Sequence, residues 1–184
     1  MLKIILSFII LTSPLGLDWD KNYSTSPPPN LEGYVQYYGS VKSGEIVYVG
    51  TKELISLETE AQILFYNRKI SEVLLVLGPE GLNSYNCLRK YKKVVSLISE
   101  KYGPKSYVLD EKDPAVEELI YFSVCRPLLV GLRQITTIWH SGGYIIEAKI
   151  LGEYQEYFIE IRYIRSKIDK ERKRDQKMKI MQKL

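Results

Sequence analysis

Between residues 134 and 163, apolar and polar residues alternate through three runs that short glycine-containing turns separate. The Ser-Gly-Gly sequence at 141–143 is typical of a hairpin turn. The runs at 144–151 and 157–163 place apolar residues on one face and charged residues on the other, which indicates strands with one buried face. Because short turns join antiparallel neighbours, this region restricts the chain to an antiparallel sheet.

Four further runs predict strands before this region. Residues 34–38 and 45–49 are short and β-prone, with Gly39 and Gly44 between them. Residues 61–66 and 70–77 flank Asn67-Arg68-Lys69 and predict a β-hairpin. The second arm of this hairpin is almost entirely apolar, so we expect it to lie centrally in the sheet.

A helix is predicted after the glycine-rich break at 78–81. Its apolar residues step by three and four, which forms one stripe; they are Leu88, Tyr91, Val95, Ile98 and Tyr102. Asn83 or Ser84 is the expected N-cap, and Gly103-Pro104 ends the helix. A second helix is predicted to open at Asp113-Pro114 and to stop at Pro127.

These elements predict an α+β fold: an antiparallel sheet of hairpins with one or two helices packed on one face, plus a C-terminal basic helix or tail. With 184 residues, the chain suits one domain with appendages. The expected division is a signal peptide at 1–16, a Pro-rich linker at 17–33, the α+β domain at 34–164, and a basic helical or disordered tail at 165–184.

The N-terminus has the layout of a secretory signal peptide. Met1-Leu2-Lys3 is a short positive region, residues 4–11 are apolar, and Pro14-Leu15-Gly16 precedes the expected cut. The apolar run is too short to span a membrane, and a buried N-terminal strand is the alternative. We therefore expect an exported protein, periplasmic or extracellular, without a transmembrane segment once the signal is removed. The following Pro27-Pro28-Pro29 predicts a stiff, extended linker.

Charge is distributed unevenly along the chain. From Arg162 to the end, ten Lys or Arg and three Asp or Glu give a net charge of +7, which leaves −3 for the rest. The tail is either a solvated charged segment or a docking segment for a protein partner in the cell envelope, and peripheral contact with an anionic surface is a further option. Nucleic acid is not expected, because the domain is acidic and lacks interleaved basic and aromatic residues. The candidate partner-binding residues are Arg165, Lys167, Lys170, Arg172, Lys173, Arg174 and Lys177.

The order of elements resembles a loose group of small exported bacterial proteins of unknown function. The matching features are the hairpin at 61–77, a helix ending in a Lys-Tyr-Gly-x-Pro-like sequence at 101–104, the Trp-bearing strand at 138–140 and the strand at 157–163. The resemblance covers about residues 45–165 and implies an envelope location and an α+β sandwich. It supplies no catalytic residues, and this chain lacks the lipid-anchoring Cys that many members carry at the signal end.

No enzyme, cofactor or metal site is predicted. His140 is the single histidine, so common zinc motifs are absent and a Ser-His-Asp triad would depend on it. It follows Trp139 at a strand end, where we expect an exposed or capped turn residue. Cys87 and Cys125 can pair in an oxidising compartment, and two buried free thiols are the alternative.

Three functions are compatible with these features. The first is a non-enzymatic accessory or structural subunit that binds a larger protein assembly through its sheet face or tail. The second is a small glycan- or peptidoglycan-binding module that uses a Tyr-rich strand surface and Trp139, since the chain has 15 Tyr. The third is a hydrolase with an unrecognised pair of carboxylates.

Overall fold

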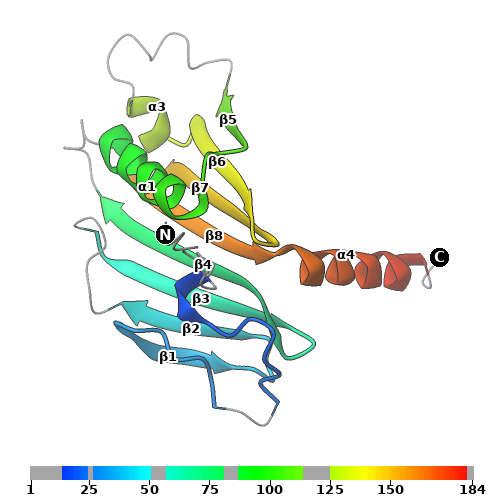
Figure 1. Ribbon diagram of the computed structural model, residues 1–184. Coiled ribbons are helices and arrows are strands. Elements are labelled where there is room, and N and C mark those ends of the chain that lie inside the picture. Colours follow the sequence, from blue (N-terminus) through cyan, green and yellow to red (C-terminus); the bar gives the residue numbers. More distant parts are fainter. Residues whose placement is uncertain (1–13, 25–26, 51–56, 81–86, 114–124, 182–184) are drawn as a thin grey trace, which may run out of the picture.

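The computed structural model describes residues 14–24, 27–50, 57–80, 87–113 and 125–181. One eight-stranded antiparallel sheet, in the order β1-β2-β3-β4-β8-β7-β6-β5, forms the body of the molecule (Figure 1). Its strands are β1 (Tyr34–Ser40), β2 (Glu45–Gly50), β3 (Thr59–Tyr66), β4 (Lys69–Glu80), β5 (Tyr107–Lys112), β6 (Arg133–Ser141), β7 (Tyr144–Glu153) and β8 (Glu156–Arg165). The helices are α1 (Cys87–Tyr102), α3 (Arg126–Leu129) and α4 (Ser166–Met181), and a short 3-10 turn, η1, covers Pro14–Gly16. The predicted α+β class with an antiparallel sheet is confirmed.

The sheet consists of two four-stranded meanders that meet where β4 pairs with β8. Across this seam Leu75 lies opposite Ile161, and Ile161 lies opposite Ala148 on β7. All three side chains are buried on the same face. The apolar run predicted to be a central strand is therefore β4, which has a neighbour on each side.

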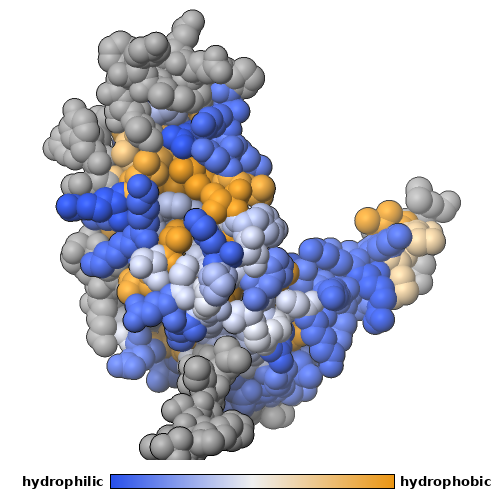
Figure 2. All heavy atoms as spheres, turned by 45° about the horizontal axis from the view of Figure 1, so that its top comes forward, coloured by the Kyte–Doolittle hydropathy of each residue, from blue (hydrophilic) through white to orange (hydrophobic). Residues whose placement is uncertain are grey.

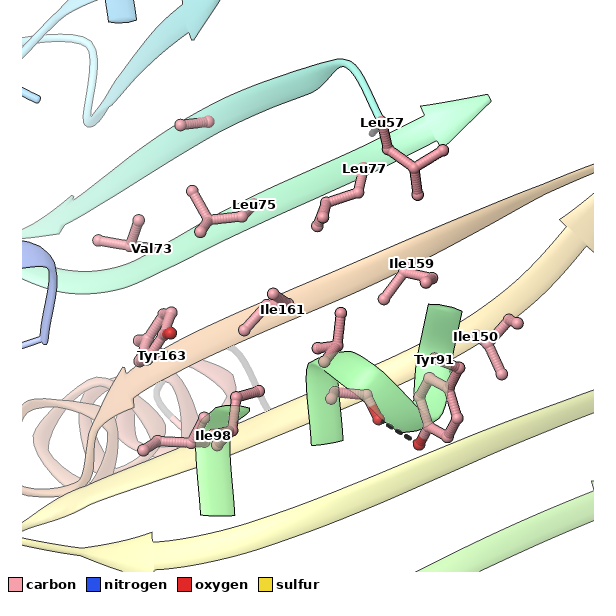
Figure 3. Close-up of a cluster of buried hydrophobic side chains, with 14 of the residues drawn as sticks. Leu57, Val73, Leu75, Leu77, Tyr91, Ile98, Ile150, Ile159, Ile161 and Tyr163 are labelled. Carbon is pink, nitrogen blue, oxygen red and sulfur yellow. Dashed lines mark hydrogen bonds between the residues drawn. The ribbon is translucent and has the colours of Figure 1, made fainter. Parts of the chain in front are cut away.

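Helix α1 covers this face over the β6–β8 half of the sheet. Its side chains Tyr91 and Ile98 point toward Ile150, Ile159 and Ile161 (Figure 3). The Tyr91 hydroxyl lies 2.8 Å from Thr137 Oγ1 and donates to the Ala148 carbonyl at 2.9 Å. The apolar stripe read from the sequence thus faces the sheet. The expected N-caps, Asn83 and Ser84, lie outside the described residues.

The described residues 17–24 and 27–33 lie over the other half of the same face, which corrects the predicted spacer. Leu17, Trp19, Tyr23 and Leu31 are buried members of the core. The proline stretch itself lies against β2, because the Tyr48 hydroxyl donates to the Pro29 carbonyl at 2.5 Å. The folded unit therefore begins well before residue 34.

Two other predicted regions differ. No strand was predicted between the two helices, yet residues 107–112 form β5, which pairs with β6. The predicted second helix falls on residues 114–124, outside the described part of the chain. After it, Pro127 lies inside the single-turn helix α3 rather than beyond a helix end, since proline fits the first turn.

A disulfide joins Cys87, the first residue of α1, to Cys125, which precedes α3. The two Cα atoms are 6.2 Å apart, and the bridge closes a loop of 38 residues that contains β5. Of the two alternatives left by the sequence, the structure has the bridge, and it contains no free cysteine.

Candidate partner-binding surface

Helix α4 continues directly from β8 and projects beyond the sheet (Figure 1). The stretch 166–181 contains no Gly or Pro to interrupt a helix. Asp169 lies in its first turn and Lys179 in its last, and both charges are favourable with respect to the helix dipole. Of the predicted basic tail at 165–184, residues 166–181 thus form a helix.

The first turns of α4 contain Ile168 and Asp169, the two buried residues of the helix. The Asp169 carboxylate accepts a hydrogen bond from Arg172 at 2.8 Å and lies 2.7 Å from the Lys173 ammonium. Burial alone would raise the pKa of Asp169. Hydrogen bonds from Lys173 and Arg172 outweigh burial and hold that pKa below its ordinary value. Asp169 is therefore a buried, ionised carboxylate whose charge two side chains of its own helix neutralise.

Contacts from β3 and β4 hold the same part of α4 against the sheet. Glu72 of β4 is 3.0 Å from Arg162 of β8 and 3.7 Å from Arg172 of α4. One turn farther along, the Tyr66 hydroxyl donates to the Asp175 carboxylate. Glu72 and Tyr66, which contact the helix, both lie far from it in the sequence. The inner half of α4, up to Asp175, is consequently fixed to the domain.

The outer end of α4, which we define as residues 176–181, is exposed throughout. Met178, Ile180 and Met181 are 48%, 62% and 65% exposed. They form the hydrophobic group at the end of the projecting arm in Figure 2. Lys177 and Lys179 lie among them, and this end contains no acidic residue. The outer end is thus an apolar and cationic surface at the periphery of the molecule.

The predicted partner-binding residues divide into two groups. Arg165 is the last residue of β8, where it stacks 4.7 Å from the Tyr144 ring centroid and pairs with Asp20 at 3.1 Å. Arg172 and Lys173 neutralise Asp169, so these three residues have structural contacts. The remaining group is exposed and consists of Lys167, Lys170, Arg174 and Lys177.

A second surface is the face of the sheet opposite α1. A shallow depression of about 130 Å³ lies there over β6, β7 and β8, lined by Thr136, Glu147, Lys149, Glu160 and Arg162. Its charges balance and oppose one another across the strands, with Glu147 facing Arg162 and Lys149 facing Glu160. Cross-strand pairs of this kind stabilise a solvated sheet face. The depression therefore offers no concentrated charge to a ligand.

His140 and Trp139, neighbours on β6, have opposite environments. His140 is exposed at the end of β6, with Nδ1 3.1 Å from Ser106 Oγ. Trp139 is fully buried and donates to Ser99 Oγ at 3.1 Å, so the predicted use of Trp139 in a glycan surface is wrong. Within the described ranges, no group of three or more His, Cys, Asp or Glu side chains is arranged to hold a metal ion. No helix among those residues is long and apolar enough to cross a membrane.

Comparison of the chain with protein-family models, with curated proteins and with solved structures finds no match in any of the three.

Proposed function

We propose that this chain is a non-enzymatic, exported accessory subunit that docks onto a larger protein assembly of the cell envelope through the outer end of α4. The observation that carries the proposal is a group of three exposed apolar side chains at the end of a helix that projects away from the sheet. Apolar groups that protrude in this way favour burial in a partner.

The charges of α4 specify the chemistry of that partner. Asp169 and Asp175 are occupied by contacts within the domain. The outer end thus presents Lys177 and Lys179 without competing acids. A partner surface with an apolar pocket bordered by Asp or Glu would complement it, because opposite charges orient the encounter while apolar burial supplies affinity.

The proposed export rests on the signal-like apolar run at residues 4–11, and the disulfide is compatible with an oxidising compartment. We therefore place the proposed docking in the periplasm or outside the cell.

The test compares the full chain with a variant that removes only the apolar side chains of the outer end, Met178→Ser/Ile180→Ser/Met181→Ser. The contacts of Ile168, Asp169 and Asp175 stay in place, so α4 remains attached. A matched control, Leu97→Ser/Val130→Ser, removes two apolar side chains of similar exposure elsewhere. Each protein is used to capture partners from solubilised envelope, and the captured protein is then purified and titrated.

We expect the purified partner to bind the wild-type chain and the control alike, and the triple variant about tenfold to hundredfold more weakly. Binding should also weaken as salt is added, since Lys177 and Lys179 are exposed. Equal binding by all three proteins would exclude the outer end of α4 as the docking element. Failure of every protein to capture a saturable partner would contradict the accessory-subunit proposal itself.

A further inference from the structure

The eight-stranded sheet has two edges, β1 and β5, each without a strand on its outer side among the described residues. An open edge presents unpaired backbone N–H and C=O groups to any strand that can align with them. Proteins usually protect such edges with charged side chains, prolines, bulges or a covering segment. The two edges of this sheet differ in that protection.

Strand β5 has charged protection. Asp110, Glu111 and Lys112 occupy half of it, and Arg133 of β6 binds Asp110 through two hydrogen bonds of 2.9 Å. A second β5 laid antiparallel on this edge and centred on the strand would set Asp110 and Glu111 opposite the apolar Leu109 and Val108. Self-pairing through β5 is therefore disfavoured.

Strand β1 has no charged residue and no proline from Tyr34 to Ser40. All of its residues after Tyr34 are exposed, with Val35 62%, Tyr37 74% and Tyr38 53% exposed. Valine and tyrosine favour strands and are common at interfaces. Its protection is one β-bulge, because Gln36 and Tyr38 oppose the consecutive residues Tyr48 and Val47 and leave Tyr37 as the extra residue.

We propose that β1 pairs with β1 of a second copy of this chain, antiparallel and about a two-fold axis. A two-fold contact requires a patch that is complementary to itself. An uncharged strand meets this requirement, because no like charges oppose one another across the axis, and a pairing centred on the strand sets Val35 opposite Gly39 and Gln36 opposite Tyr38. Main-chain hydrogen bonds across the axis would join the two sheets into one.

Strand β1 lies at the edge of the sheet opposite β5. It forms the border of the sheet opposite the half that α1 and α3 cover, and α4 leaves the domain elsewhere (Figure 1). Tyr37 is the middle residue of the strand. In a symmetric pairing centred on the strand, the Tyr37 residues of the two copies lie beside each other.

The experiment tests this symmetry by introducing a positive charge at position 37 in one variant and a negative charge at the same position in another. Tyr37→Lys and Tyr37→Glu are prepared separately, and sedimentation velocity is measured for wild type, for each variant and for their equimolar mixture over a wide range of concentration. Leu109→Lys, on exposed β5, is the control. We expect a wild-type dimer, an unchanged dimer for Leu109→Lys, and a dimer weakened about tenfold or more in each Tyr37 variant alone.

The mixture of the two Tyr37 variants should recover the dimer, since Lys then faces Glu. Circular dichroism establishes that each variant is folded, and Val35→Lys replaces Tyr37→Lys if that protein does not fold. A wild-type chain that stays monomeric at every concentration overturns the proposal. So does a dimer that the Tyr37 charges leave unaffected, or a mixture of folded variants that remains monomeric.

Discussion

At the scale of single residues, helix α1 contains two tyrosines, Tyr91 and Tyr102, whose hydroxyl groups are both buried but differ in their hydrogen bonding. Burial raises the pKa of both Tyr91 and Tyr102 to about 12. The Tyr91 hydroxyl donates its hydrogen to the Ala148 carbonyl, so Thr137 is the donor in their mutual contact. The Tyr102 hydroxyl is buried and has no hydrogen-bond partner within the described residues. An unpaired buried hydroxyl costs stability, whereas a paired one contributes to it.

We therefore expect Tyr91→Phe and Tyr102→Phe to have different effects. Tyr91→Phe leaves Thr137 without its acceptor and should lower the free energy of unfolding by about 1–2 kcal/mol. Tyr102→Phe removes a hydroxyl that makes no bond and should leave that free energy unchanged or raise it. Urea denaturation of the two variants measures both values, and each serves as the control for the other. Equal losses would show that the Tyr102 hydroxyl has a partner.

At the scale of elements, α4 shows how a helix that is polar on nearly all sides is held in place. Its first turns are stabilised by ionised Asp169, which pairs with Arg172 and Lys173 of the same helix and whose folded-state pKa lies below the ordinary value of 3.8. A lowered pKa contributes stability that is present above pH about 4 and is lost as pH falls through the folded-state value. Acid should therefore destabilise the first turns of α4 before the sheet unfolds.

Hydrogen exchange of the α4 amides, measured as pH is lowered from neutral, tests this expectation. After correction for the intrinsic exchange rate, protection of the inner half should fall below pH about 4 while protection of β7 and β8 persists. Asp169→Asn should reproduce the loss at neutral pH, and Glu171→Gln, a half-buried neighbour on the same helix, should not. Retained protection in Asp169→Asn would show that Ile168 and Asp175 suffice to hold the helix.

The sequence predicted best those strands and helices in which buried residues recur at a regular spacing along the chain. Strands β7 and β8 and helix α1 each bury one face, so the spacing of their own residues reveals them. Strand β5 was missed because it is exposed on both faces and therefore shows no alternation. The anchors of α4 could not be predicted either, since Glu72 and Tyr66 meet the helix only after the two meanders have paired.

The N-terminal stretch illustrates the same limit across the whole molecule. Trp19 and Tyr23 stand among polar residues without a helical or strand period, so the sequence suggested a spacer. Their burial depends on distant partners: Trp19 packs edge-on against Tyr144 at 5.2 Å between centroids, and Tyr23 against Phe65 at 5.8 Å. Since Tyr144 belongs to β7 and Phe65 to β3, this stretch spans the seam between the two meanders.

A segment that contacts both meanders should make their unfolding a single event. Trp19 is its largest buried side chain, and its indole N–H also donates to the Pro14 carbonyl at 3.1 Å. Trp19→Ala should therefore lower the free energy of unfolding of the whole domain by about 3–5 kcal/mol. Tyr154→Ala, at a site 88% exposed, is the control and should change it by less than about 0.5 kcal/mol. Thermal unfolding followed by calorimetry and by tyrosine fluorescence reports both values. We expect one coincident transition, shifted to lower temperature in Trp19→Ala. Separate transitions for the two meanders would contradict this expectation, and so would a Trp19→Ala variant as stable as Tyr154→Ala. Either result would show that β4 and β8 join the halves without the N-terminal stretch.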